Sequence, residues 1–283
     1  MRSRKIEEAI FRGIMIAATL VVLSCSILIL ATILIKGLPA MNLDMITKTP
    51  KGGYYLGKSG GILNAIVGSI LLTGGATLVS IFLSLPVALY ANVYADKSSK
   101  LIAFTRVSLD VLWGVPSIVY GAFGFTIMLF LGLKASLLGG IIAVALLIFP
   151  IMSRGMDEVM RMVPKELLNS SYALGATRFE TALKVVVRQA LPGILSAVLI
   201  AFGRGIGDAA SVIFTAGFSD RINFSLFEPA ATLPLAIFFQ LGTPFPEVQE
   251  RAYASALILT IIVFLISIGS RILIRRYSKH VIK

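Results

Sequence analysis

The decisive stretch reads QALPGILSAVLIAFGRGIGDAASVIFTAGFS, residues 189–219. It is mostly apolar and contains two charged residues, Arg204 and Asp208. About 20 apolar residues suffice to cross the hydrocarbon core of a bilayer, so the stretch predicts a transmembrane helix over about residues 191–212. Ionisable side chains inside a membrane are costly to bury and usually serve a function. Arg204 and Asp208 are therefore our first candidate site residues.

The composition of the whole chain indicates a membrane protein. Of its 283 residues, 57% are hydrophobic and 14% are charged, and the mean hydropathy is +0.91. The formal net charge of +12 comes from basic residues in short flanks between apolar segments. Basic flanks of this kind indicate how transmembrane helices are oriented in the bilayer. A nucleic-acid-binding surface would instead need a basic stripe with stacking aromatic residues.

Cysteine and histidine are too scarce for several kinds of chemistry. The one cysteine, Cys25, lies inside the first apolar segment, and the one histidine, His280, lies in the basic tail. This usage excludes a disulfide framework and makes a zinc site or a histidine-based catalytic triad very improbable. We expect no metal and no cofactor.

Stretches free of charge predict six transmembrane helices. They cover residues 13–35, 60–95, 111–133, 135–153, 252–270 and, with two charges, 189–219. Residues 60–95 are interpreted as one long span with an interfacial extension, because no polar cluster divides them. Pro116 marks the start of a helix or a kink. The expected fold class is an all-α membrane protein.

Positive charge orients these helices. Eighteen of the 26 Lys and Arg residues fall on the side that holds both termini and residues 154–188, and seven fall on the other side. Cytoplasmic loops carry the excess of Lys and Arg. We therefore predict that both termini are cytoplasmic.

One nucleotide-binding motif is rejected from its context. Residues 52–59, GGYYLGKS, satisfy the pattern of a phosphate loop. Such a loop follows a buried strand and opens a helix whose amides point at the nucleotide. Here no apolar strand precedes the motif, and the predicted orientation places it outside the cell. We do not expect the chain to hydrolyse ATP.

The cytoplasmic connection over residues 154–188 is more informative. Pro164 can open a helix that runs to Gly175, and residues 176–190 predict a second, amphipathic helix. Its apolar side is expected to hold Phe179, Leu183 and Val186 or Val187. The residues alone leave two interpretations open, a helix that enters a groove of a partner protein and a helix that lies on the bilayer.

The sequence NSSYALG at residues 169–175, followed by Val185 and Val187, resembles the coupling loop of ABC importer permeases. That loop has an acidic-Ala-Ala triplet, a glycine six residues after the acid, and a later apolar-x-apolar-Pro. In this chain Asn169 replaces the acid, Ser170 and Ser171 replace the alanines, and Arg188 replaces the proline. The resemblance implies that an ATPase subunit docks on Asn169, Ser170, Ser171, Gly175, Val185 and Val187.

Three further motifs resemble the phosphate importer permeases of the PstA type, over roughly residues 60–275. They are GGILNAIVG at 60–68, PSIVYG at 116–121, and RGIGD at 204–208 with FTA at 214–216. In that family a glutamate usually follows the arginine by four residues, where this chain has Asp208. The resemblance implies a type I, MetI-like importer fold and a permease subunit for inorganic phosphate in a prokaryotic inner membrane. It also implies ATPase subunits, a homologous permease subunit and an external phosphate-binding protein as partners.

Arg204 and Asp208 have two possible roles. Four residues apart on a helix, they are predicted to share a face near the bilayer midplane. They could neutralise each other and pin helices together. Alternatively, the planar guanidinium of Arg204 binds phosphate oxygens while Asp208 orients it and limits the affinity.

The expected organisation has three parts. Residues 1–59 hold the N-terminal tail, the first helix and an external loop, residues 60–275 form the importer domain, and residues 276–283 form a basic tail. Two alternatives to phosphate import remain at this point. One is a permease for another oxyanion or a PstC-type subunit, and the other is a secondary transporter or anion channel that needs no ATPase.

Overall fold

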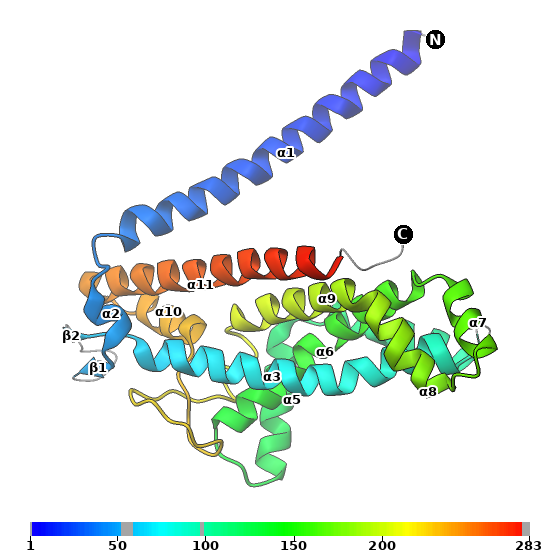
Figure 1. Ribbon diagram of the computed structural model, residues 1–283. Helices are drawn as coiled ribbons and strands as arrows, with labels where there is room; N and C mark the ends of the chain where they lie inside the picture. Colours follow the sequence, from blue (N-terminus) through cyan, green and yellow to red (C-terminus); the bar gives the residue numbers. More distant parts are fainter. Residues whose placement is uncertain (1, 52–58, 97–98, 279–283) are drawn as a thin grey trace.

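The computed structural model describes residues 2–51, 59–96 and 99–278, and its secondary structure is almost entirely helical (Figure 1). Two short antiparallel strands, β1 (Pro50–Lys51) and β2 (Ser59–Gly60), pair near the start of the second span. The helices are α1 (Arg2–Gly37), α2 (Leu43–Thr47), α3 (Leu63–Leu89) with the π-helix η1 (Tyr90–Tyr94), α4 (Lys100–Trp113), α5 (Ser117–Phe130), α6 (Leu137–Arg161), α7 (Lys165–Ala173), α8 (Arg178–Glu180) with the π-helix η2 (Thr181–Val187), α9 (Arg188–Ile206), α10 (Leu233–Leu241) and α11 (Pro246–Ser278).

Six membrane spans fit this arrangement. Five helical stretches of the described chain are long and apolar enough to cross a bilayer: Glu7–Gly37, Leu63–Tyr94, Leu137–Arg161, Arg178–Ile206 and Pro246–Ile272. The sixth is the pair α4 and α5, bent by 102°. The six-helix prediction is therefore confirmed, and the third span is bent beside Pro116, where a helix start or a kink was predicted, although it begins at Lys100 rather than at residue 111.

The bend between α4 and α5 has a local cause. Pro116 precedes the first residue of α5 and has no N–H to continue a helix, and the residue before a proline is pushed toward extended backbone. Helix α4 accordingly ends at Trp113, followed by Gly114 as its C-cap. The Tyr120 hydroxyl donates to the Leu112 carbonyl at 2.8 Å, which ties the two helices together across the bend.

Helices α3 and α6 form the centre of the body. They run parallel in a fixed register, because the Ser80 hydroxyl donates to the Ala145 carbonyl at 3.0 Å and the Ser84 hydroxyl donates to the Phe149 carbonyl at 3.4 Å. Small hydroxylated residues at helix contacts allow close approach of two backbones in a membrane. Helix α9 packs on the same pair through its small residues Ala197 and Ala201.

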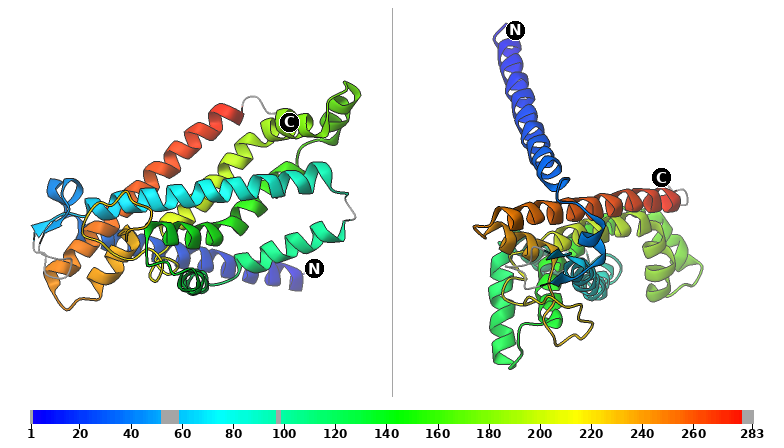
Figure 2. Two further views of the ribbon diagram at one scale, coloured as in Figure 1. Left: turned by 90° about the horizontal axis from the view of Figure 1, so that it is seen from below. Right: turned by 90° about the vertical axis from the view of Figure 1, so that its left-hand side faces the viewer.

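Helix α1 leaves the body at one end and extends away from it (Figures 1 and 2). It contacts α11 near its C-terminal end, where a Cβ on Gly37 would lie 2.7 Å from the Tyr253 carbonyl oxygen. The ammonium group of Lys36 lies 4.9 Å from the centroid of the Tyr253 ring. The apolar side chains along the rest of α1 are exposed in the isolated chain.

Residues 207–232, between α9 and α10, contain no long helix. Their backbone carbonyls cap the N-terminus of α6: Ser136, Leu137 and Leu138 donate their N–H groups to Thr215, Glu228 and Leu226 at 2.8–2.9 Å. The helix predicted as far as residue 212 is therefore wrong beyond Ile206.

Candidate functional site

Arg204 and Asp208 do not share a helix face. Arg204 lies in the last turn of α9 on its exposed side, one turn after Ile200, and Gly207 ends the helix. Asp208 is 9% exposed and lies beyond the helix, where its Oδ2 accepts the Ser211 N–H at 2.8 Å. No ion pair joins the two side chains within the ranges that the structure describes. The predicted direct pair is therefore wrong, and Arg204 lies near a helix end rather than in its middle.

Glycine explains where α9 stops. Gly203, Gly205 and Gly207 alternate in its last turn, and each glycine costs a helix about 1 kcal/mol relative to alanine. Gly205 has a packing role, because a Cβ there would lie 3.1 Å from Val144 and 3.2 Å from Thr73. The other two glycines do not pack so closely against side chains of the described chain.

The motifs used for the family resemblance come together around residues 207–232. A Cβ on Gly68 would clash with the Ala231 carbonyl, and a Cβ on Gly121 would lie 2.8 Å from the carbonyl oxygens of Ala210 and Ser211. Glycine at these places lets α3 and α5 approach an irregular backbone. The motifs thus form one packed unit next to Arg204.

The helices of the fourth and fifth spans both extend into the predicted connection over residues 154–188. Helix α6 continues to Arg161, and the next helix begins at Arg178 and runs without interruption into α9. A capping box formed by Thr177 and Glu180 starts this helix. The amphipathic helix predicted as separate over residues 176–190 is therefore continuous with α9, and residues 162–177 connect it to α6.

The apolar side of that segment also differs from the prediction. Phe179 and Leu183 are exposed, whereas Val186 is buried and Val185 and Val187 are half-buried. The prediction assumed 3.6 residues per turn, but η2 is a π-helix with more residues per turn. Its side chains therefore point in other directions than an α-helix would give them.

Gly175 ends α7 in a left-handed conformation, with φ of 83°. The Gly175 N–H donates to the Tyr172 carbonyl at 2.9 Å, and the Ala176 N–H donates to the Ser171 carbonyl at 3.1 Å. Glycine is the residue that adopts this conformation without a steric penalty. The glycine of the quoted motif therefore sets the direction of the chain after α7.

The remaining residues of the motif lie on and around α7. Asn169 and Ser170 are exposed, and Ser171 is half-buried with its hydroxyl 2.9 Å from the Thr181 hydroxyl. Large apolar residues of the same segment are exposed as well: Leu174 is 89% exposed, and Met162 and Phe179 are also exposed. Of the rejected phosphate loop, residues 52–58 lie outside the described residues, as does His280.

A buried ionic cluster near the same end of the molecule was missed by sequence reasoning. Asp157 of α6 is 3% exposed and accepts two hydrogen bonds from Arg106 of α4, at 2.8 and 2.9 Å. Its carboxylate also accepts from Asn92 at 2.8 Å and from Arg154 at 3.2 Å. Arg154 bridges onward to Asp110 at 2.6 Å. Arg106 and Asp157 are 51 residues apart, so no local pattern could have paired them.

Fold and motifs together define the class of protein: a multi-pass membrane component of a transport system. The profile described as "Binding-protein-dependent transport system inner membrane component" matches residues 80–283, and the chain belongs to that family. It is a transport subunit rather than an enzyme.

Relatives narrow this class to one type of permease. The chain is 30% identical to the phosphate transport system permease protein PstA of Haemophilus influenzae over 273 residues, covering 95% of this chain and 94% of that protein. It is 34% identical to PstA of Yersinia pestis over 252 residues, covering 89% and 84%.

Solved structures bear on the fold alone. An inward-facing MetNI methionine ABC transporter superposes with a TM-score of 0.63 at 19% identity, covering 76% of this chain and 95% of that chain. The expected MetI-like importer fold is confirmed.

Proposed function

We propose that the chain is the PstA-type permease subunit of an ATP-driven importer of inorganic phosphate. The observation that carries the proposal is the similarity to PstA proteins over nearly the whole length of both chains. Its partners are then ATPase subunits, a homologous permease subunit and an external phosphate-binding protein. The importer domain over residues 60–275 forms part of the pathway.

The surface around α7 supports docking of an ATPase subunit. A helix on an aqueous surface normally covers its large apolar side chains, and here Met162, Leu174 and Phe179 are exposed. Asn169 and Ser170 supply exposed neutral polar groups on α7. In place of the acidic residue of the family pattern, Asn169 contributes an amide, so docking rests on shape and apolar contact more than on a salt bridge.

The fifth span links this surface to the candidate phosphate site. One continuous helix, Arg178–Ile206, begins beside α7 and ends next to Arg204. The Ser171–Thr181 hydrogen bond fastens α7 to its first turns, and the Arg178 guanidinium donates to the Tyr94 carbonyl at 3.4 Å. ATP binding to the docked subunits would move α7, and this helix would carry the movement toward Arg204.

Arg204 is the residue that would contact phosphate. Its planar guanidinium can donate two parallel hydrogen bonds to phosphate oxygens, which an ammonium group cannot do. The side chain is exposed in the isolated chain, and in the described part of the molecule it has no ion-pair partner. Asp208 contributes by holding the turn after α9 through Ser211 rather than by neutralising Arg204.

The orientation belongs to the same proposal. The first residues of α1 and the last described residues of α11 lie toward the same side of the molecule as α7 and α8 (Figure 1). If α7 meets a cytoplasmic ATPase, both termini are cytoplasmic, and the protein lies in a prokaryotic inner membrane. The excess of Lys and Arg on this side supports the assignment.

Uptake of labelled phosphate by proteoliposomes tests the proposal. We expect ATP-dependent uptake with the wild-type complex and almost none with Arg204→Ala. With Arg204→Lys we expect the half-saturating phosphate concentration to rise more than about tenfold, since one charged hydrogen bond contributes roughly 1.5–3 kcal/mol. Arg221→Ala is the matched control, because it removes an exposed arginine of the connection between α9 and α10. Wild-type uptake of phosphate with Arg204→Ala would contradict the role of Arg204.

A further inference from the structure

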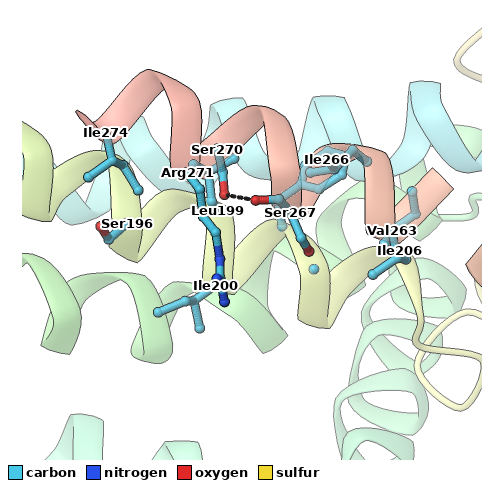
Figure 3. A pocket seen from close by; sticks show the side chains of 12 residues that line it. Ser196, Leu199, Ile200, Ile206, Val263, Ile266, Ser267, Ser270, Arg271 and Ile274 are labelled. Atoms are coloured by element: carbon cyan, nitrogen blue, oxygen red, sulfur yellow. Dashed lines mark hydrogen bonds between the residues drawn. The ribbon is translucent and has the colours of Figure 1, made fainter. Parts of the chain in front are cut away.

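A cleft of about 390 Å³ lies between α9 and α11 (Figure 3). The two helices are antiparallel neighbours, and the cleft follows α11 from Val263 to Ile274. On α9, Gly203 opens it, because a Cβ at this position would meet no atom within 4 Å. The cleft therefore has room that the described chain does not fill.

The walls of the cleft are apolar. They include Leu199, Ile200, Phe202, Val263, Ile266 and Ile274. Two of its serines are already bonded to their own helices, since the Ser196 hydroxyl donates to the Pro192 carbonyl at 2.9 Å and the Ser270 hydroxyl donates to the Ser267 carbonyl at 2.7 Å. Such walls suit a hydrocarbon chain and provide little for a free, hydrated anion.

One cation enters the cleft. Arg271 lies next to the last residue of the candidate span Pro246–Ile272, and Figure 3 shows its side chain extending from α11 toward Ile200 of α9. Among the described residues, no carboxylate pairs with it. A guanidinium at the edge of a membrane span is well placed for a phosphate group at headgroup level.

The cleft below Arg271 has room for most of one leaflet's depth. Eight helical steps separate Val263 from Arg271, about 12 Å at 1.5 Å per residue. One leaflet contributes about half of the 30 Å hydrocarbon core. Helix α11 runs toward the end of the molecule that carries α7 (Figure 1), so Arg271 lies nearer to that end than Val263 does.

We propose that this cleft is a binding site for an anionic phospholipid, with one acyl chain between α9 and α11 and the headgroup phosphate on Arg271. The apolar walls, the stretch of about 12 Å between Val263 and Arg271, and a cation that no carboxylate of the described residues pairs with together favour a lipid. The proposal rests on the membrane fold and does not depend on phosphate import.

Native mass spectrometry of the delipidated complex, titrated with phosphatidylglycerol or phosphatidylethanolamine, tests the site. We expect the wild type to bind phosphatidylglycerol more tightly than phosphatidylethanolamine. In Arg271→Gln the ratio of the two affinities should fall about fivefold, since one arginine near the surface contributes roughly 1 kcal/mol. Arg275→Gln, one turn further along α11 and outside the cleft, is the matched control.

A second variant tests the acyl chain separately from the headgroup. Gly203→Leu fills the open cleft and should lower retention of both lipids, whereas Gly269→Leu, exposed on α11 and outside the cleft, should not. An unchanged preference in Arg271→Gln, or unchanged retention in Gly203→Leu, would overturn the proposal. So would efficient crosslinking of a cysteine at position 203 to the partner permease, because a protein helix would then fill the cleft. None of these measurements needs phosphate or ATP, so their failure leaves the transport proposal intact.

Discussion

The hydroxyl groups of Ser171 in α7 and Thr181 in η2 lie 2.9 Å apart. Thr181 is fully buried, and the helix that contains it continues to Ile206, two residues past Arg204. This hydrogen bond closes the turn around Gly175. The proposed docking helix is thereby fastened to the span that carries the proposed phosphate contact.

Ser171→Ala tests this fastening. The substitution leaves the buried Thr181 hydroxyl without its partner and removes about 1 kcal/mol of hydrogen bonding. We expect the ATPase subunits to remain bound, while the number of phosphate ions taken up per ATP hydrolysed falls at least twofold. Ser170→Ala, which changes the exposed neighbour, should keep the wild-type ratio. Equal ratios in the two variants would mean that the bond plays no part in coupling.

Gly175 gives a prediction about docking itself. With φ of 83°, a side chain at this position costs about 1–2 kcal/mol in backbone strain, although no atom lies within 4 Å of the added Cβ. We expect Gly175→Val to redirect the chain after α7 and to abolish co-purification of the ATPase. Asn tolerates the left-handed conformation better than other side chains, so Gly175→Asn should still co-purify with the ATPase. Loss in both variants would instead indicate that the ATPase contacts this position directly.

The Asp157 cluster predicts a large effect on stability. Asp157→Asn keeps the shape of the side chain but leaves Arg106 and Arg154 without their buried counter-charge, which should lower the free energy of unfolding by about 3 kcal/mol. Asp110→Asn removes the half-exposed partner of Arg154 and should cost less than about 1 kcal/mol. Thermal unfolding in detergent compares the two variants. Similar losses of stability in the two variants would show that the buried carboxylate of Asp157 stabilises the fold no more than the half-exposed carboxylate of Asp110.

Two glycines of α3 offer a matched pair for packing. A Cβ on Gly68 would clash with the Ala231 carbonyl, whereas one on Gly74 would meet nothing within 4 Å. Gly68→Ala should therefore destabilise the fold by about 1–3 kcal/mol through overpacking. Gly74→Ala should be neutral or stabilising by up to about 1 kcal/mol, since alanine is the better helix former. Melting temperatures that shift equally would contradict the close approach of α3 to residues 207–232.

The sequence was sufficient for the spans because a 20-residue apolar stretch is a local signal. Pro116 likewise marked the bend before α5. The end of α9 was missed because residues 207–219 are as apolar as a transmembrane helix. Their backbone carbonyls instead accept hydrogen bonds from Ser136, at the start of α6, and from Asn64 of α3. That outcome depends on tertiary contacts such as Ser136 with Thr215.

The candidate site was predicted in part. Gly175 and its spacing located the turn after α7, since a left-handed glycine has a local sequence signature. The geometry of Arg204 and Asp208 could not be predicted, because their spacing of four residues has meaning only inside a continuous helix. The Asp157 cluster joins three distant segments, and charges at the ends of spans are ordinarily interpreted as orientation signals.

The most direct test of the account is the initial rate of labelled phosphate uptake into vesicles that contain both permease subunits and the external binding protein, with and without the ATPase subunits and ATP. The account predicts uptake only when ATPase and ATP are both present. Uptake at the same rate from vesicles that lack the ATPase would contradict it.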